Sequence, residues 1–295
     1  MNNIITNEIF PKVLVYKNMF TDIKNTLKVI KESESSDTSE YITKWGQWGD
    51  FGTIAKTAEN FEGLNLNTES AKNQFKILTE LFENYNLAAK NYIQRYKNEI
   101  NWPDFISHFN LDSSPWIKAR ADILKYDVGT QRSMSLYYHV DQNRWSLSSA
   151  GPKFVLTITV YLTDDYEGGE ISFLNDETNE ILTYKPQAGD IVVFPSFYPY
   201  HHGVMRVLSG EKYLFRMFVK WNYEGDKEWN ALKEKYGIEQ MEKMDLDELE
   251  RKSQLALEKF YNSENPDASY EPNVIMPEKN KKTYTTKYID GRDLK

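Results

Sequence analysis

The sequence predicts an α+β protein whose core is an antiparallel sandwich or barrel with helices before and after it. Two observations support this fold class. The first hundred or so residues carry apolar side chains largely at helical spacing, whereas from about residue 119 the apolar runs are short and turn residues separate them. About seven such runs follow one another with no helix between them. This order favours antiparallel pairing over a parallel α/β sheet.

The N-terminal part of the chain is predicted to form one strand and two helices. The run 13–16 is apolar and valine-rich, as in a strand. Thr21 is a suitable N-cap for a short helix with apolar residues on one face. The stretch 32–40 is acidic and serine-rich, so we expect a loop there. A long helix over 67–100 follows, and Pro103 lies just beyond its end.

The second part of the chain is predicted to form the sheet core. Its expected strands are 123–126, 154–162, 171–174, 181–184, 191–194, 204–208 and 213–221. Beyond them helical periodicity returns in two segments, and the final residues are polar and lysine-rich. We therefore divide the chain into a mostly helical N-terminal region that supports the core (1–118), the core itself (119–222), and a C-terminal helical extension with a loosely held polar tail (223–295).

Composition narrows the chemistry that the protein can carry. Its 295 residues include 36 Lys and Arg against 44 Asp and Glu, a net charge of −8, which argues against binding to nucleic-acid phosphates. Because the chain has no cysteine, disulfides, thiolate nucleophiles and iron–sulfur clusters are excluded. A transition metal would need ligands from the four histidines and some carboxylates.

No stretch of the sequence resembles a targeting or membrane-spanning segment. The N-terminus lacks a basic start followed by an apolar run and a small-residue cleavage site. No run approaches the roughly 18 apolar residues of a membrane span, and the mean hydropathy is −0.66. We therefore expect a soluble, cytoplasmic protein with no membrane partner.

His139 and Asp141 form the first candidate site. Residues two apart on a strand project from the same face, so the imidazole and the carboxylate would point to one place. With a histidine from elsewhere they would build a 2-His-1-carboxylate triad, a ligand set typical of non-haem Fe(II). The pair by itself also fits a surface strand with a salt-bridged histidine.

Two further candidates lie later in the core. His201 and His202 stand together at the start of an apolar run, where one of them could supply the third ligand. Lys212 and Arg216 fall on one face of the last expected strand, which is otherwise apolar on both faces. A buried cation needs a partner. That partner is either an internal carboxylate or the carboxylate of a substrate or cosubstrate.

In order and with their spacers, these pieces resemble the prolyl 4-hydroxylase-like branch of the Fe(II)/2-oxoglutarate-dependent dioxygenases. The matching motifs before the final one are Tyr126-Asp127-Val128-Gly129, His139-Val140-Asp141, Tyr161-Leu162, Gly168-Gly169-Glu170, Pro186, Gly189-Asp190 and Phe194-Pro195-Ser196. The pattern closes with a histidine followed by Val, Gly and a basic residue at offsets of five, eight and ten. His202 meets these offsets and His201 does not, and the basic residue is Lys212. The resemblance covers about a third of the chain.

The resemblance implies a double-stranded β-helix (jelly-roll) core with N-terminal and C-terminal helices packed around it. It implies a set of Fe(II) ligands that consists of His139, Asp141 and His202. It further implies that 2-oxoglutarate and O2 are cosubstrates, with ascorbate as a possible additional cofactor, and that Lys212 pairs with the distal carboxylate of 2-oxoglutarate. Tyr126 either adds a hydroxyl to that carboxylate or is an ordinary core tyrosine. Arg216 shares the face of Lys212 and is the alternative anchor.

One departure from the family pattern concerns Arg206, which stands where the family often has proline. Strict alternation along the strand would aim Arg206 inward beside His202. We therefore expect a bulge or a substrate contact at this position.

These observations predict a hydroxylase that acts on an unactivated C–H bond, most simply of a peptidyl proline, and releases succinate and CO2. The alternatives are a hydroxylase of another amino-acid residue or a small molecule, a non-catalytic jelly-roll binding module, and a nucleic-acid demethylase. The complete triad together with Lys212 argues against the binding module, and the net negative charge argues against a nucleic-acid partner. The oligomeric state stays open.

Overall fold

The computed structural model describes most of the predicted core and the segments that support it. The described residues are 6–35, 41–48, 52–57, 65–96, 98–99, 121–128, 138–141, 154–175, 177–220, 251–252, 255 and 284–294. The two helices predicted after residue 222 fall almost entirely outside these ranges. Gly129 of the first motif and the remaining histidine of the sequence, His108, also lie outside them.

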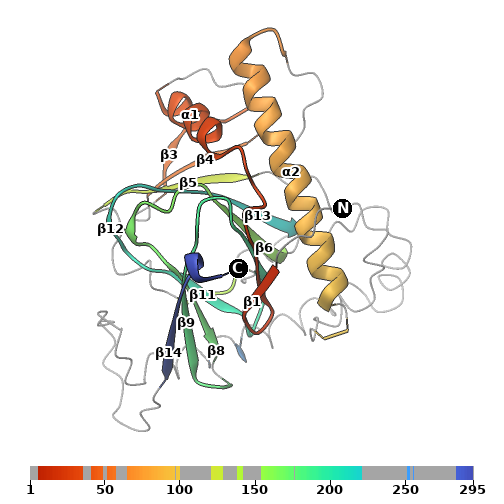
Figure 1. The fold of residues 1–295 in the computed structure, drawn as a ribbon, viewed down its shortest axis with the longest axis vertical. Coiled ribbons are helices and arrows are strands. Elements are labelled where there is room, and N and C mark those ends of the chain that lie inside the picture. The colour runs from red at the N-terminus through yellow and green to blue at the C-terminus, as the bar shows by residue number, and fades with distance from the viewer. Residues whose placement is uncertain are drawn as a thin grey trace.

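A large antiparallel sheet forms one wall of the core (Figure 1). Its strands are β1 (Thr6–Phe10), β2 (Val13–Tyr16), β3 (Gly46–Gln47), β4 (Thr53–Lys56), β5 (Asp122–Tyr126), β6 (Phe154–Tyr161), β10 (Ile191–Pro195) and β13 (Lys212–Lys220). They lie in the order β1-β2-β10-β6-β13-β5-β4-β3. The non-sequential neighbours show that β6, β10 and β13 are paired across long connections, as the predicted jelly roll requires.

A second sheet forms the opposite wall. Its strands are β8 (Ile171–Asn175), β9 (Glu180–Lys185), β11 (His201–Val204) and β14 (Thr285–Asp290), in the order β11-β8-β9-β14. Side chains of both sheets meet between the walls, where the ring of Phe173 on β8 lies 5.2 Å from that of Phe194 on β10 in an edge-to-face arrangement. A short pair, β7 (Glu167–Gly168) and β12 (Val207–Ser209), closes one end.

Strand β13 shows the predicted two-sided burial. Tyr213, Phe215 and Met217 belong to the apolar cluster outside the barrel, whereas Leu214 belongs to the cluster between the two sheets. Lys212 and Arg216 share the inner face with Leu214, because successive side chains of a strand alternate between its faces. The two basic side chains are therefore directed toward the inside of the barrel.

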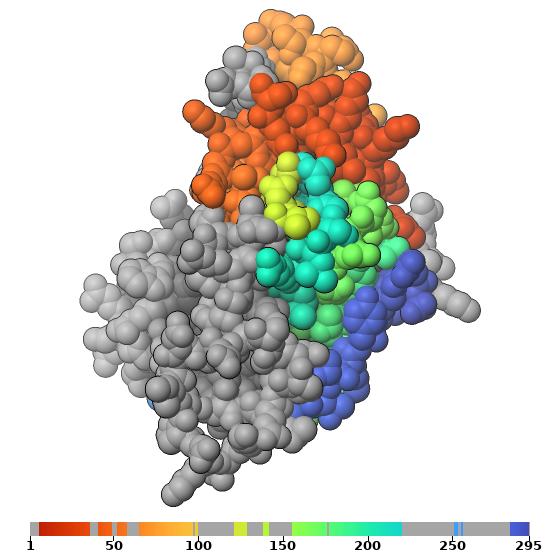
Figure 2. All heavy atoms as spheres, turned by 90° about the vertical axis from the view of Figure 1, so that its left-hand side faces the viewer, coloured from red at the N-terminus to blue at the C-terminus, as the bar shows by residue number. Residues whose placement is uncertain are grey.

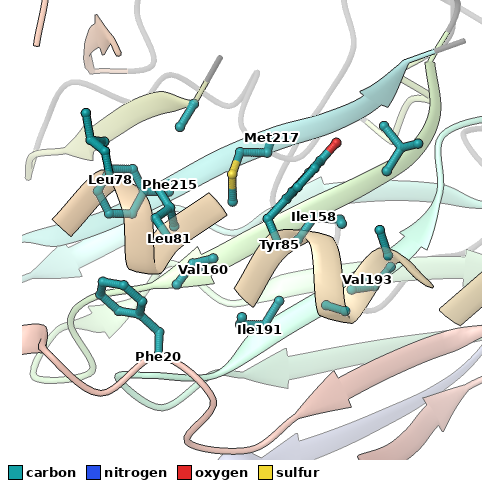
Figure 3. Close-up of a cluster of buried hydrophobic side chains, with 14 of the residues drawn as sticks. Phe20, Leu78, Leu81, Tyr85, Ile158, Val160, Ile191, Val193, Phe215 and Met217 are labelled. Carbon is teal, nitrogen blue, oxygen red and sulfur yellow. The ribbon is translucent and has the colours of Figure 1, made fainter. Parts of the chain in front are cut away.

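Helices α1 (Ile23–Glu34) and α2 (Glu69–Tyr96) cover the outer face of the large sheet. Helix α2 begins after Thr68, whose hydroxyl accepts the N–H of Ala71 as an N-cap. Its apolar stripe packs on the sheet, and Figure 3 shows Leu78, Leu81 and Tyr85 of the helix against side chains of the strands. No helix of the described ranges is long and apolar enough to cross a membrane.

Tyrosine hydroxyls fasten α2 to the sheet. The fully buried Tyr85 donates to the backbone oxygen of Phe218 at 2.8 Å, and Tyr92 donates to that of Lys12 at 2.6 Å. Replacing Tyr85 with phenylalanine should lower the free energy of unfolding by about 1–2 kcal/mol, because a buried carbonyl loses its donor. Urea denaturation measures this loss. Tyr288→Phe is the control and should change little, because the Tyr288 side chain is exposed.

The structure adds strands at both ends of the chain. The N-terminal region contains the two expected helices, and β1 to β4 join the large sheet beside them. The polar tail also contains a strand: β14 pairs in parallel with β9, and Figure 2 shows the C-terminal residues in blue along the surface. Four of the six residues of β14 are exposed, so the strand has little apolar alternation from which it could be predicted.

A buried ion pair joins three segments that are far apart in the sequence. Lys17 Nζ lies 2.8 Å from Asp190 Oδ2 and donates to the carbonyl of Gly291 at 2.8 Å. The same carboxylate oxygen accepts the hydroxyl of Tyr184 at 2.9 Å and the N–H of Gln187 at 3.0 Å. The Gly-Asp turn of the sequence motif thus connects the N-terminal strand to the segment that follows β14.

Candidate active site

Three metal-ligating side chains meet at one edge of the small sheet. His202 lies on β11, and the backbone of His139 pairs with it through reciprocal N–H···O bonds of 2.9 and 3.0 Å. The two imidazole rings lie 4.4 Å apart. Asp141 follows two residues after His139, and one ligand atom from each of the three side chains lies within 4.8 Å of the others. The structure therefore brings together the three residues that the sequence selected as ligands.

The Asp141 carboxylate lies between the two histidines. Its Oδ2 is 3.4 Å from His202 Nε2, and its Oδ1 is 3.7 Å from His139 Nε2. Thr157 on β6 donates its hydroxyl to Oδ2 at 2.5 Å. The His139 side chain is 49% exposed, whereas the Asp141 side chain is 7% exposed, so the cluster is open to solvent on the side of His139.

The protonation states of the cluster suit metal binding. Burial lowers the pKa of His202 to about 3, so its imidazole is neutral near pH 7. Burial alone would raise the pKa of Asp141, but the neighbouring His202 and His139 outweigh it and hold that pKa well below its usual range. A neutral imidazole and an ionised carboxylate are the forms in which these side chains bind metals. Two imidazoles with one carboxylate fit Fe(II) and leave coordination positions for small ligands.

Lys212 lies inside the barrel with its side chain fully buried. Its ammonium donates to the carbonyl of Gly169 at 2.6 Å and lies 4.9 Å from the ring centre of Tyr126. The rings of Tyr161 and Tyr166 are 5.5 and 5.8 Å away. Among the described residues no carboxylate forms an ion pair with Lys212. These rings therefore surround a cation that forms no ion pair among the described residues and is attracted by the Glu170 carboxylate only from a distance, which fits an anionic ligand.

Burial and one neighbouring ammonium group make the charged form of Lys212 costly. Burial, and then the ammonium of Lys185, lower the pKa of Lys212 to about 7. Lys185 binds the carbonyls of Tyr166 and Gly168 at 2.5 and 3.2 Å, so it and Lys212 hold the same loop. Within the described residues, the buried hydroxyl of Tyr166 has no hydrogen-bond partner. A carboxylate beside Lys212 would relieve the repulsion between the two ammonium groups.

Tyr126 and Arg216 are the two other residues that the sequence placed near the carboxylate of 2-oxoglutarate. Tyr126 lies directly opposite Lys212 in the β13–β5 pairing, and burial raises its pKa to about 12, so its hydroxyl remains a donor. Arg216 lies opposite Asp122, and its guanidinium forms an ion pair of 3.0 Å with that carboxylate. It also lies 5.0 Å from the ring centre of Trp48. Of the two partners that the sequence allowed for Arg216, the structure contains the internal carboxylate, that of Asp122.

Other sequence candidates take structural positions. Arg206 is exposed in the break between β11 and β12, where the expected run 204–208 divides into two strands. This agrees with the predicted irregularity, because the side chain leaves the inner face. Gly168 has a φ of +70°, and a Cβ there would lie 2.0 Å from the carbonyl oxygen of Arg206. Only glycine fits this turn. The sequence predicted no site role for Thr157, Tyr166 or Lys185, because a single hydroxyl, phenol or lysine has no distinctive spacing. Ser196 was matched only as the last residue of the Phe-Pro-Ser motif.

Residues 122–220 match the family model described as the 2OG-Fe(II) oxygenase superfamily. This segment is a 2OG-Fe(II) oxygenase domain. It contains β5 to β13 and therefore the ligand cluster, Lys212 and Tyr126. This match confirms the superfamily resemblance that the sequence showed. The protein is therefore an enzyme that uses Fe(II), 2-oxoglutarate and O2.

The chain is also similar to solved structures at low identity. A prolyl-4-hydroxylase from Pseudomonas putida is 13% identical over 72% of this chain and 93% of its own, with a TM-score of 0.42. A prolyl hydroxylase from Trichoplax adhaerens, in complex with a hypoxia inducible factor peptide fragment, is 13% identical over 75% and 86%, with a TM-score of 0.42. The viral collagen prolyl hydroxylase of Paramecium Bursaria Chlorella virus-1 is 15% identical over 72% and 96%, with a TM-score of 0.39. No curated protein matches the chain.

Proposed function

We propose that this oxygenase is a cytoplasmic hydroxylase of an unactivated C–H bond in a peptidyl proline. The balanced reaction consumes 2-oxoglutarate and O2, inserts one oxygen atom into the C–H bond, and places the other in succinate as CO2 is released. Fe(II), when bound with both cosubstrates, would activate O2, which is the oxidant in this reaction. The observation that carries the proposal is the presence, within one barrel, of a His-Asp-His cluster and a buried lysine with no described carboxylate partner.

The proposal assigns the metal to His139, Asp141 and His202. Two of the three come from paired backbone positions, so their rings are held together by the sheet rather than by a flexible loop. The third ligand is held by the hydroxyl of Thr157. The ring of Phe194 lies 4.5 Å from that of His202 and keeps one side of the cluster apolar. Such surroundings favour a dry reaction site.

The proposal assigns the distal carboxylate of 2-oxoglutarate to Lys212. A protonated Lys212 has two N–H donors beyond the one that binds Gly169. The phenol of Tyr126 is on the same inner face and remains protonated, so it can donate a further hydrogen bond. Arg216 is the alternative anchor, and its ion pair with Asp122 makes it the weaker candidate.

The open side of the cluster supports a substrate that approaches from the surface. His139 is the exposed member of the three, so a bond presented by a polypeptide segment can reach the metal position without entering the barrel. The prolyl 4-hydroxylase-like pattern of the sequence supports a proline in that segment. Another residue type or a small molecule is the alternative outcome of the experiment that follows.

The test of the proposed function is O2-dependent succinate formation. The protein is prepared without O2, loaded with Fe(II) in the presence of ascorbate, and supplied with 2-oxoglutarate and a panel of proline-containing peptides. We expect succinate, and a mass increase of one oxygen atom in a subset of peptides. Succinate without peptide modification would redirect the search to metabolites and other residues. Absence of both turnover and 2-oxoglutarate binding would leave only a binding module.

Replacing Lys212 with methionine should weaken 2-oxoglutarate about 100-fold, because a buried charge pair is lost. The measurement is the KM for 2-oxoglutarate, with calorimetric binding to the Mn(II)-loaded protein as a second readout. Arg216→Met is the matched variant on the same strand face and should change the KM by less than about threefold. A larger effect of Arg216→Met than of Lys212→Met would show that Arg216, and not Lys212, binds the distal carboxylate of 2-oxoglutarate.

The same assignment predicts a pH dependence. The pKa of Lys212 is lowered to about 7 without the ligand, and a bound carboxylate raises it again. Below that pH the lysine is already charged, whereas above it the lysine must take up a proton when 2-oxoglutarate binds. The affinity should therefore fall as the pH rises above about 7. Calorimetry in buffers of different ionisation enthalpy measures the proton uptake, which Lys212→Met should remove.

A further inference from the structure

A pair of buried hydroxyls lies behind the Asp141 carboxylate. Thr157 on β6 donates to Asp141 Oδ2 at 2.5 Å, and its oxygen lies 2.8 Å from the hydroxyl of Ser196. The two hydroxyl-bearing residues are 1% and 0% exposed. Ser196 belongs to the Phe-Pro-Ser motif, to which the proposed function gives no role.

The number of hydroxyl protons decides which group donates and which accepts in this series of hydrogen bonds. A threonine hydroxyl has one proton, and the ionised carboxylate can only accept. Since Thr157 gives its proton to Asp141, Thr157 must accept from Ser196 at the 2.8 Å contact. The order of donation is therefore Ser196 to Thr157 to Asp141.

The surroundings of Thr157 give no packing reason for a hydroxyl. Thr157 is on the central strand β6, and its cross-strand partners are Phe194 on β10 and Phe218 on β13. Valine has nearly the same shape and would avoid the cost of burying a polar group. Among the described contacts, the one acceptor of the proton of this hydroxyl is Asp141.

We propose that Thr157 is a positioning residue for the metal, and that Ser196 orients its proton. The inference rests on the proposed function, because Asp141 is taken as a ligand. By holding Oδ2, the Thr157 hydroxyl fixes the plane of the carboxylate and makes Oδ1 the better donor toward a metal. Hydrogen bonds to the ligands of a metal typically change its affinity about 10–100-fold when they are removed.

The test is metal binding by the ligand-free protein. Mn(II) is titrated into each variant and followed by electron paramagnetic resonance, and Co(II) absorption reports on the ligand set. Thr157→Val should weaken Mn(II) about 10–100-fold, and Thr157→Ser should restore the affinity to within about threefold of the natural protein. Ser196→Ala should have a smaller effect than Thr157→Val, because Thr157 keeps its donor to Asp141.

Thr159→Val is the matched control. Thr159 is two residues along the same face of β6, and its hydroxyl is 3.5 Å from the carbonyl of Val192, with no described contact to Asp141. Its affinity for Mn(II) should stay within about threefold of the natural protein. Should Thr157→Val fail to fold, Thr157→Ala compared with Thr157→Ser isolates the hydroxyl in the same way.

The outcomes separate this inference from the proposed function. Asp141→Asn shows whether Mn(II) binds through Asp141 at all, and if it does not, both proposals fall. If Asp141→Asn loses Mn(II) while folded Thr157→Val binds it as the natural protein does, the role of Thr157 alone is overturned. Equal losses in Thr157→Val and Thr159→Val would assign the effect to packing of β6, which also overturns it.

Discussion

Replacing His202 with alanine should reduce succinate formation at least about a thousandfold, because it removes a metal ligand and a metal contributes several kcal/mol to such a reaction. His202 is directed at Asp141, with 3.4 Å between Nε2 and Oδ2. The variant should also lose Mn(II) binding in titrations of the ligand-free protein. Both measurements are referred to the folded fraction, determined by circular dichroism.

His201→Ala is the control for this prediction. His201 is the neighbouring histidine on β11 and is also fully buried, but alternation places it on the opposite face of the strand. Its ring lies 5.7 Å from that of Tyr198. We expect lower stability and nearly unchanged turnover of the folded protein. Loss of turnover in His201→Ala with full turnover in His202→Ala would reverse the assignment.

Replacing Asp190 with alanine should lower the free energy of unfolding by about 3–5 kcal/mol, because it leaves a buried lysine without its partner. Asp190 is fully buried, and the side chain of Lys17 is 7% exposed. The substitution also removes the acceptor of the Tyr184 hydroxyl. Urea denaturation followed by fluorescence measures the change.

Two further variants test the origin of this effect. Asp164→Ala is a matched carboxylate deletion at an exposed position, where the side chain accepts the N–H of Ala188, and it should cost less than about 0.5 kcal/mol. Lys17→Met combined with Asp190→Leu should recover part of the loss, because apolar side chains replace the whole ion pair. A loss in Asp190→Ala no larger than that in Asp164→Ala would contradict a buried pair.

The core strands could be predicted because their burial is periodic. The expected run 191–194 corresponds to Ile191–Pro195, and 171–174 corresponds to Ile171–Asn175. The long helix expected over 67–100 is Glu69–Tyr96. In each case an apolar pattern extends over the whole element, and both faces or one stripe are buried.

Short or exposed strands could not be predicted in this way. β3 and β7 have two residues each, which is too few to show a period. β14 is mostly exposed and is held by backbone pairing with β9. Backbone pairing does not require a particular side-chain pattern, so the sequence of β14 does not predict a strand. The run 204–208 was expected as one strand and is divided at Arg206, because the backbone there turns to bind the loop of Gly169.

The residues of the site likewise fall into those that could be predicted from the sequence and those that could not. His139, Asp141, His202 and Lys212 have fixed spacings in a known pattern, so they could be selected before the fold was known. The hydrogen bond from Thr157 to Asp141 joins residues 16 positions apart that come into contact only in the folded protein. Arg216 was left with two partners, and the register opposite Asp122 supplies the internal one. The spacing of residues along the sequence does not tell which of them pair across the sheet.

The bond from Lys17 to Gly291 has a consequence for the time course of folding. It joins residues 274 positions apart, and closing so long a loop is entropically costly and slow. During synthesis β9 is complete long before β14, its parallel neighbour, has left the ribosome. Until then the edge of β9 is unpaired and open to other chains. The nascent oxygenase domain therefore passes through a period of aggregation risk that ends only when residues near Gly291 arrive.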